Sequence, residues 1–302
     1  MTPSASATAA GPMPADRPAG PWLRAWRRAR GRPASAAGAL IVLLFVATAL
    51  AAPWIAGADP IKPAFGQRLQ PPRGLGGAAA HPLGTDNLGR DILARLLYGG
   101  RISLVLATSA VALAAGAGVV VGLAAGVLGG RLDAFVMRLA DVQLAFPVIM
   151  LAIAIVAVVG TSPAALVSVL ALSGWVLYAR TVRAAVLTIR EADYVQAART
   201  LGAGDLRVVA VHILPNTLAP ILVLGSSQFA TMVLLESGLS FLGLGLQPPQ
   251  PSWGLMLAEG RDYLSNAWWL ATVPGIAISL VVLGANLLGD GLRDLLDPRL
   301  RQ

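Results

Sequence analysis

The sequence predicts an all-α integral membrane protein with six transmembrane helices. Hydrophobic residues make up 56% of its 302 residues and charged residues only 13%, whereas an ordinary soluble domain carries about 25% charged residues. The mean hydropathy is correspondingly high, at +0.70. The apolar residues also form runs of the length that a helix needs to cross the hydrocarbon layer, about 20 residues. Composition and run length therefore both place most of the chain inside a membrane.

The apolar runs set the order of elements along the chain. Six of them are expected to span the membrane, at about residues 34–56, 102–128, 139–159, 164–187, 217–240 and 271–290. Around them we expect a disordered basic cytoplasmic tail over 1–33, an anchor helix over 34–56, an extracytoplasmic loop over 57–101, a five-helix core over 102–292 and a cytoplasmic tail over 293–302.

Arginine predicts which side of the membrane each loop occupies. Cationic residues collect in cytoplasmic loops, and an N-terminus inside the cell leaves 16 of the 23 cationic residues on the cytoplasmic side. Both termini are therefore expected in the cytoplasm. The ATALAA string before Pro53 is similar to a signal-peptide cleavage site, but the leader before it is longer than the usual charged region of such a peptide. We interpret the first span as an uncleaved anchor.

The composition also argues against several classes of function. The chain has no cysteine, which excludes disulfides and thiolate metal sites. Its two histidines, His81 and His212, are expected on opposite sides of the membrane, which disfavours a metal site. The only lysine, Lys62, lies in DPIKPAF, so a phosphate-binding loop of the G-x4-G-K-[ST] type is missing. The net charge of +8 follows the membrane sides and does not indicate a nucleic-acid partner.

Glycine recurs every four residues in the second expected span, at Gly118, Gly122, Gly126 and Gly130. This spacing places four bare backbone patches on one helical face, where another helix can approach closely. We expect that helix to belong to the same chain.

A charged segment, residues 191–216, separates two apolar runs and predicts a helical hairpin. Tyr194, Ala198 and Leu201 share one helical face. Gly202 is suited to end that helix in the left-handed conformation, and Asp205 is suited to be the N-cap of the next helix.

The second helix of the hairpin is expected to be short. Leu206, Val209 and Ile213 repeat the helical spacing, and Pro215 is expected to interrupt the helix before the fifth span. Such a hairpin, with the small residue Ala197 beside Ala198, can fit into a cleft of another protein or lie on the lipid surface. The residue pattern alone leaves both interpretations open.

Acidic residues inside the membrane are candidates for function. Glu236 is the only acid deep in the fifth span, so it can face a translocation pathway, or pair with an arginine or a backbone group near the outer interface. The string G-A-G-D at 202–205 matches a motif of intramembrane aspartyl proteases. That chemistry needs two facing aspartates inside the membrane, whereas Asp205 and Asp193 lie together in a basic loop. We therefore expect no catalytic site.

The hairpin resembles the EAA loop of permease subunits in ABC importers. The pattern A-A-x3-G followed by Leu-Pro is carried by Ala197, Ala198, Gly202, Leu214 and Pro215. Gln196 stands where the motif usually has a glutamate, which leaves the strength of coupling open.

Four further strings resemble one branch of these permeases. They are HPLGTDNLGRDILARLLYGGRISL at 81–104, LSFLGLGLQPPQPSWGLMLAEG at 239–260, and AWWLATVPG and NLLGDGLRDLLDPR near the end of the chain. Together they are similar to the dipeptide/oligopeptide/nickel permease family, particularly its second-permease, dipeptide-permease-C-like branch. The resemblance covers about residues 35–299.

The resemblance implies a type I ABC importer permease fold and a set of partners. Residues 189–216 would be the coupling loop that docks into an ATPase, with Tyr194 and Asp205 taking part beside the five motif residues. ATP and Mg would be bound by two separate ATPase subunits, and this chain would bind no cofactor. A second homologous permease would complete a heterodimer in the bacterial inner membrane, and an extracytoplasmic solute-binding protein would deliver cargo.

Residues on the outer side receive two interpretations each. Asp86, Arg90 and Asp91 either contact a partner protein or form a local loop, with Asp86 or Asn87 as the helix N-cap and Arg90 and Asp91 in solvent. Trp253 either belongs to an outer gate or docking shelf or is an interfacial anchor, as are Trp268 and Trp269.

Dipeptides or oligopeptides are the expected cargo, with nickel chelates, glutathione and opines as alternatives in the same family. A gradient-driven secondary transporter is the rival from another class, and it would need charged relays in the membrane. Only Glu236 fits such a relay. An exporter is disfavoured because the EAA-type loop is an importer feature.

Overall fold

The computed structural model describes residues 33–296, and all regular elements in that range are helical. Most of the expected tails, 1–33 and 293–302, lies outside the described residues. The elements are α2 (Pro33–Leu50), α3 (Ala52–Ile55), η1 (Phe65–Gln67), η2 (Arg73–Leu75), α4 (Ile92–Leu128), α5 (Gly130–Leu144), α6 (Val148–Val159), α7 (Pro163–Ile189), α8 (Asp193–Thr200), α9 (Asp205–Val208), η3 (Val209–Ile213), α10 (Leu214–Phe241), α11 (Trp253–Arg261) and α12 (Trp269–Leu296).

Five helical stretches are long and apolar enough to span a membrane, or six if the bent pair α5 and α6 counts as one span. Five of the six predicted spans are therefore confirmed as helical stretches, and the number reaches six only if the bent pair is the remaining span. The first expected span, 34–56, is α2 followed by the short α3. The long stretches are α2, α4, α7, the run from α9 to α10, and α12.

The third span is not the straight helix that the run over 139–159 predicted. α5 and α6 meet at a bend of 92°, next to Pro147, which has an extended backbone (ψ 133°) and precedes α6. Proline has no N–H for the helical ladder and disfavours the helical conformation in the residue before it. α6 has 12 residues, about 18 Å of helix, so it is too short to cross a layer of about 30 Å by itself.

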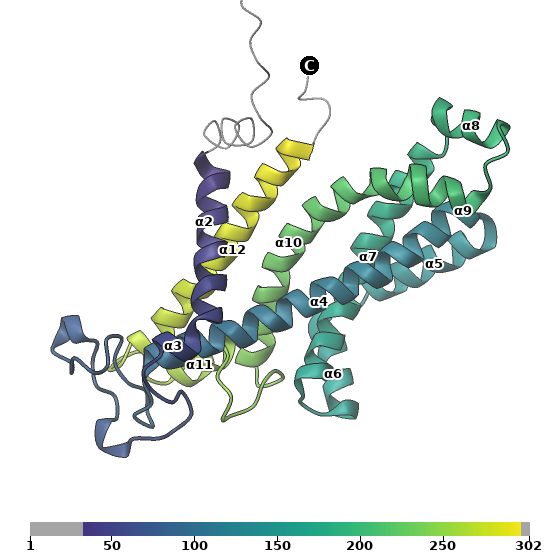
Figure 1. Cartoon of the computed structure of the whole chain (residues 1–302). Helices are drawn as coiled ribbons and strands as arrows, with labels where there is room; N and C mark the ends of the chain where they lie inside the picture. The colour runs from purple at the N-terminus through teal and green to yellow at the C-terminus, as the bar shows by residue number, and fades with distance from the viewer. Residues whose placement is uncertain (1–32, 297–302) are drawn as a thin grey trace, which may run out of the picture.

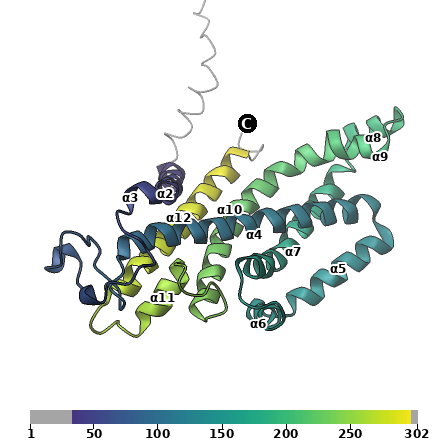
Figure 2. The same ribbon diagram turned by 60° about the horizontal axis from the view of Figure 1, so that its bottom comes forward.

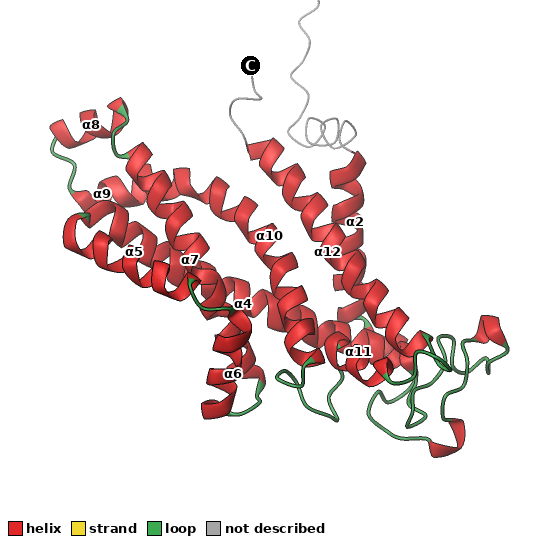
Figure 3. Cartoon of the chain, turned by 180° about the vertical axis from the view of Figure 1, so that it is seen from behind, coloured by secondary structure: helices red, strands yellow, loops and turns green. Residues whose placement is uncertain are grey.

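One side of the helix bundle carries the N-terminal end of α2, the C-terminal end of α12 and the α8–α9 hairpin (Figures 1 and 3). The loop before α4, the helix α11 and the end of α6 lie on the opposite side. α4 runs along the middle of the molecule and passes α12, α10 and α7 (Figure 2). We refer to the two sides as the hairpin side and the opposite side.

The glycine face of α4 packs against α7, which confirms the expected contact within the chain. A Cβ atom added to Gly122 would lie 2.5 Å from the carbonyl oxygen of Ala179, and Gly118 and Gly126 face α7 in the same way. Gly130 does not belong to this face, because it follows the end of α4 at a φ of +56° with open space around it. Bare backbone at three of the four positions therefore sets the α4–α7 distance.

We expect Gly122→Ala to destabilise the protein. The added methyl would collide with the backbone of Ala179, and overpacking of this kind costs about 1–3 kcal/mol. Gly116→Ala is the matched control on the same helix, because no atom lies within 4 Å of its Cβ position. The thermal unfolding midpoint in detergent would measure both; equal midpoints would contradict the assigned α4–α7 packing.

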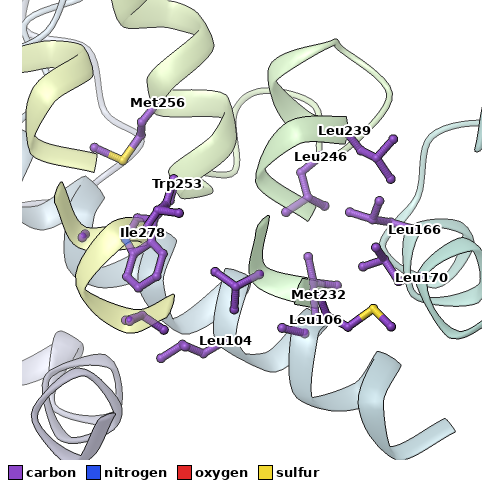
Figure 4. Packing of buried hydrophobic residues seen from close by; sticks show 14 of the residues in the cluster. Leu104, Leu106, Leu166, Leu170, Met232, Leu239, Leu246, Trp253, Met256 and Ile278 are labelled. Carbon is purple, nitrogen blue, oxygen red and sulfur yellow. The ribbon is translucent and has the colours of Figure 1, made fainter. Parts of the chain in front are cut away.

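A buried apolar cluster joins α4, α7, α10, α11 and α12 (Figure 4). Trp253 is the largest fully buried side chain of this cluster, with 1% of its surface exposed. Its ring meets Phe45 of α2 edge-on at 5.6 Å, and its Nε1–H donates to the carbonyl oxygen of Leu96 at 2.9 Å. The expectation that Trp253 is an interfacial anchor is therefore wrong, because the protein itself surrounds the ring and satisfies the indole N–H.

The two neighbouring tryptophans differ from each other. Trp269 is also buried, and its Nε1–H donates to the carbonyl oxygen of Thr85 at 3.3 Å. The anchor expectation is wrong for Trp269 for the same reason. Trp268 has about half of its surface exposed, so it alone of the three remains available at the surface.

Candidate functional site

The α8 helix of the hairpin ends as the sequence predicted. Gly202 has a φ of +89°, its N–H donates to the carbonyl oxygen of Arg199 at 2.9 Å, and the N–H of Ala203 donates to Ala198 at 3.0 Å. This pair of bonds is the Schellman arrangement, which satisfies the last free carbonyl groups of a helix. The corner between α8 and α9 is therefore fixed by backbone hydrogen bonds.

Asp205 does not cap the second helix, contrary to the prediction. Gly204 occupies the N-cap position with an extended backbone, and Asp205 is the first residue of α9. The carboxylate of Asp205 instead pairs with Arg199 at 3.1 Å, and its charge suits the positive end of the helix dipole. The ion pair links the two arms of the hairpin.

Pro215 does not interrupt the chain before the fifth span either. The helix continues from Asp205 to Phe241 through the π-turn η3, in which the N–H of Leu214 donates to the carbonyl oxygen of Val209. Pro215 then falls in the first turn of α10. A π-turn shifts the hydrogen-bond ladder by one residue, so the proline is accommodated without a break. α9 and α10 therefore form one continuous lever.

One face of the hairpin is anchored to the membrane bundle. Val195 of α8, Val208 of α9 and Ile213 are fully buried against Val182 and Val186 of α7. Burying such side chains stabilises by about 1.5–3 kcal/mol each. The hairpin is thus held as a rigid extension of α7 and α10.

The other face of the hairpin is uncovered. Leu201 is 88% and Leu206 83% exposed, and the small residue Ala197 lies exposed between the arms. We call these three residues the hairpin tip. Apolar side chains this exposed, on a rigid support, are typical of a docking surface.

The remaining predicted loop residues lie around this tip. Tyr194 is half-exposed and its ring meets His212 edge-on at 6.0 Å, which ties α8 to η3. Ala198 and Leu214 are half-buried and Pro215 is exposed. Tyr194 and Ala198 therefore lie in the α8–α9 hairpin, whereas Leu214 and Pro215 begin α10.

Gln196 has a structural partner that explains its presence. Its Nε2 donates to the carbonyl oxygen of Arg190 at 2.8 Å, at the end of α7. The last carbonyl groups of a helix lack partners within the helix, and the amide supplies a donor there. A glutamate at this position has no such donor when ionised.

On the opposite side, Asp86 is the centre of a buried charge cluster. One of its oxygens accepts from the backbone N–H groups of Leu88 and Arg90, at 2.8 and 2.9 Å. The other accepts from Arg90 Nε at 2.6 Å and from Arg95 Nη1 at 2.5 Å. Both arginines also contact Glu259 of α11, at 3.2 and 2.6 Å. The cluster fastens the loop before α4 to α11.

Asp91 is the N-cap of α4, so the expectation that Asp86 or Asn87 caps this helix is wrong. One oxygen of Asp91 accepts from the N–H of Ala94 at 2.7 Å and the other from His81 at 2.8 Å. Arg90 and Asp91 are each only 4% exposed, so the expectation that they are solvated is wrong too. α4 begins at Ile92, later than a cap at Asp86 or Asn87 would place it and ahead of the expected membrane span from residue 102, so the cap position falls on Asp91.

Sequence reasoning missed Arg95 and Glu259 as members of this cluster. Arg95 is 1% exposed although it is charged, and its partner Glu259 is 164 residues away along the chain. The short distance between Asp86 and Arg95 was the only local signal. Because Asp86, Arg90 and Asp91 are buried, they build the loop and offer little surface to a partner.

Glu236 is fully buried near the end of α10. Its Oε1 accepts from Ser240 Oγ at 2.9 Å, and Ser237 Oγ lies 3.5 Å from Oε2. No arginine in residues 33–296 pairs with it. Its partners are serine hydroxyls, so the pairing with arginine that the sequence left open is not observed.

Comparison with known proteins identifies the family. Residues 118–302 match the model of a binding-protein-dependent transport system inner membrane component. Residues 20–72 match the N-terminal transmembrane domain of oligopeptide transport permease C.

Several curated proteins resemble the chain over most of their length. A di/tripeptide transport system permease of Pseudomonas aeruginosa is 47% identical over 87% of this chain and 88% of its own. A dipeptide transport system permease of Alkalihalophilus pseudofirmus is 40% identical, over 93% and 91%. A glutathione transport system permease of Pectobacterium atrosepticum is 41% identical, over 93% and 92%. The chain therefore belongs to the family of binding-protein-dependent transport system inner membrane components, the membrane permease subunits of ABC importers.

Proposed function

We propose that this permease forms half of a pathway that imports dipeptides or oligopeptides, and that partner ATPases drive it through the hairpin. The observation that carries the proposal is the hairpin tip. Leu201 and Leu206 are almost fully exposed, while the base of the hairpin is buried against α7. A rigid base with an apolar tip is suited to a cleft in a partner protein, since burying both leucines would recover their hydrophobic free energy.

The continuous helix from Asp205 to Phe241 supports a mechanical role for this contact. A displacement of the tip would be transmitted to α10, because the helix passes through η3 without a loop, although Pro220 inside α10 removes one hydrogen bond of its ladder. α10 packs against α4, α7, α11 and α12. ATP binding in the partner could therefore change the arrangement of the bundle and expose cargo to either side in turn.

The remaining partners follow from the family. Two ATPase subunits would hold ATP and Mg, a second homologous permease would form the other half of the pathway, and a solute-binding protein would deliver cargo from outside. This chain would itself bind no cofactor and catalyse no reaction. The N-terminal end of α2 and the C-terminal end of α12 lie on the same side as the hairpin (Figure 1). Because the hairpin would meet the ATPases in the cytoplasm, this arrangement supports cytoplasmic termini in the bacterial inner membrane.

Peptides are the cargo favoured by the relatives. The permeases of Pseudomonas aeruginosa and Alkalihalophilus pseudofirmus are named for di- and tripeptides and for dipeptides. The glutathione permease of Pectobacterium atrosepticum supports glutathione, itself a peptide, as the second candidate. Nickel chelates and opines have no such support among these three relatives.

Glu236 remains a candidate for the translocation pathway and for a gradient-driven mechanism. Glu236→Gln keeps an acceptor for Ser240 and removes the charge. We expect it to retain peptide uptake within about twofold, because the amide oxygen can still accept the hydrogen bond from Ser240 and no arginine of residues 33–296 pairs with this side chain. Uptake measured with and without a proton gradient is the test. A loss of uptake with normal folding would assign the charge a part in transport.

Co-purification tests the proposed assembly. The tagged chain would be extracted gently from its native membranes, and the recovered proteins identified by mass spectrometry. We expect two ATPase subunits and a second permease, and uptake of di- and tripeptides after reconstitution with the binding protein. Recovery of this chain alone, under conditions that preserve other ABC importers, would contradict the proposal and favour a self-contained transporter.

A further inference from the structure

A cleft with both apolar and polar lining residues lies between α10 and α12 on the hairpin side of the molecule. It has a volume of about 730 Å³, within the range of about 300–1,000 Å³ that is typical of small-molecule sites. Thr181 of α7 contributes to one wall. α10 and α12 diverge towards the hairpin side (Figures 1 and 3), and the cleft contains residues from both of their hairpin-side ends, Asn216 and Arg293. Pro215 and Asn216, at the end of the coupling segment 189–216, are among the lining residues, whereas the hairpin tip and the buried charge cluster contribute none.

Close helix packing closes the cleft at one point. A Cβ atom added to Gly289 of α12 would lie 2.2 Å from Ser226 Oγ of α10. The two helices therefore touch there, and Ser226 and Gly289 both line the cleft. The fold forms the cleft by itself, between two helices that are already in contact.

The lining is unusual for a membrane bundle because it combines opposite charges with neutral hydrogen-bonding groups. Asp290 and Arg293 of α12 both line it and are both exposed. Within residues 33–296 neither of them forms an ion pair. The amides of Asn216 and Asn286 and the hydroxyl of Ser227 lie on the same walls. Because Asp290 and Arg293 are exposed near the hairpin-side end of α12, both are accessible to a charged ligand.

Asp290 and Arg293 are about one helical turn apart, a distance comparable with the length of a short peptide. Residues three apart on a helix have Cβ atoms about 5–6 Å apart, which is the relation of Asp290 to Arg293. The ends of an extended dipeptide lie at most about 7 Å apart. A free peptide carries an ammonium group at one end and a carboxylate at the other, so its charges complement this pair.

We propose that this cleft is a transient binding site for the zwitterionic backbone of a peptide as it passes to the hairpin side. Asp290 accepts hydrogen bonds from the ammonium group, and Arg293 donates to the carboxylate. Asn216 and Asn286 hydrogen-bond the peptide group between the two charges. The site binds the backbone and leaves the side chains of the cargo in the open cleft. This inference rests on the proposed peptide import and assigns residues to it.

Reconstituted complexes with charge-removing variants test the cleft. We expect Asp290→Asn and Arg293→Gln each to lower the uptake of a di- and tripeptide mixture about tenfold or more at subsaturating concentration, since each removes a charge-assisted hydrogen bond. Asp290→Glu should restore most of the uptake. ATP hydrolysis stimulated by the binding protein should stay within about twofold of the wild type, since a charge contact with cargo is not part of the coupling route.

Two control variants each remove one charge, negative or positive, at a position outside the cleft. Asp262→Asn and Arg131→Gln replace exposed residues that do not line the cleft, and both should leave uptake unchanged. Equal uptake by the cleft variants and these controls would overturn the inference. A parallel loss of ATP hydrolysis and uptake would also overturn it, because the charges would then serve assembly or coupling.

A labelling measurement distinguishes cargo from a helix of the second permease as the occupant. The chain has no cysteine, so Asn286→Cys introduces a single reactive thiol in the cleft. In inverted vesicles that contain the assembled complex, we expect a charged maleimide to label it and the peptide mixture to slow labelling. A thiol that never reacts in the assembled complex would assign the cleft to the second permease and overturn the inference.

The same data separate this inference from the proposed function. A wild-type complex that imports no peptide would refute peptide import and this site together. A wild-type complex that imports peptides, with unchanged uptake in both cleft variants, would refute the site alone.

Discussion

Gly202→Pro is expected to reduce peptide uptake by the assembled complex to background. Gly202 has a φ of +89°, whereas proline fixes φ near −65°. The substitution also removes the N–H that donates to the carbonyl oxygen of Arg199. The angle between α8 and α9 would then change. Leu201 would move away from the position in which the hairpin tip meets its partner. Uptake and the amount of chain in the membrane would be measured together.

Gly204→Ala is the matched control for this prediction. Gly204 has a φ of −67°, which any residue adopts, and no atom lies within 4 Å of its Cβ position. We expect this variant to transport at the wild-type rate. Normal uptake by Gly202→Pro would show that the geometry of the corner carries no coupling.

Asp86→Ala is expected to destabilise the protein strongly. Asp86 accepts four hydrogen bonds, two of them from the guanidinium groups of Arg90 and Arg95. Both arginines are buried, and removal of one partner from a buried ion pair costs about 3–5 kcal/mol. The loop before α4 should detach from α11. Thermal unfolding of the purified chain in detergent would measure the loss, and limited proteolysis would locate it.

An exposed ion pair is the control for the buried one. Arg261 and Asp262 form a pair whose side chains are both mostly exposed, so Asp262→Ala should change stability by less than about 0.5 kcal/mol. Similar stabilities of the Asp86 and Asp262 variants would contradict the role of the buried cluster. Retained uptake at low temperature by Asp86→Ala would support a role in stability alone.

The sequence predicted the elements whose cause is local. Apolar runs of span length indicated the membrane helices, the glycine repeat indicated the α4–α7 contact, and Gly202 marked the end of α8. In each case the signal lies within one segment of chain. The hairpin itself was predictable because its charged stretch interrupts two long apolar runs.

Long-range contacts explain what the sequence did not predict. The first ten residues of α4 contain Arg95 and Arg101, so they read as a loop, although Asp86 and Glu259 neutralise Arg95 inside the protein. Trp253 reads as an interfacial anchor, yet Phe45 and Leu96 from distant segments enclose it. Neither partner is visible from the neighbouring residues.

Backbone adjustments explain the other differences. Pro215 has the signature of a helix break, but the π-turn η3 before it shifts the ladder and lets the helix continue. Pro147, by contrast, does end a helix and bends the third span by 92°. The same residue type thus has opposite outcomes, and the deciding factor is the hydrogen bonding of the preceding turn.

Cross-linking from a single introduced cysteine tests most directly whether the hairpin tip docks on an ATPase. Leu201→Cys would place a single thiol on the tip, because the chain has no cysteine of its own. Val158→Cys is the control: Val158 is 86% exposed, against 88% for Leu201, and lies at the end of α6 on the opposite side (Figure 1). A thiol-to-amine cross-linker would be applied to native membranes. We expect a cross-link from Leu201→Cys to an ATPase subunit, which is lost when Gly202→Pro is added, and no such cross-link from Val158→Cys. Absence of any ATPase cross-link to Leu201→Cys, in membranes that import peptide, would contradict this docking.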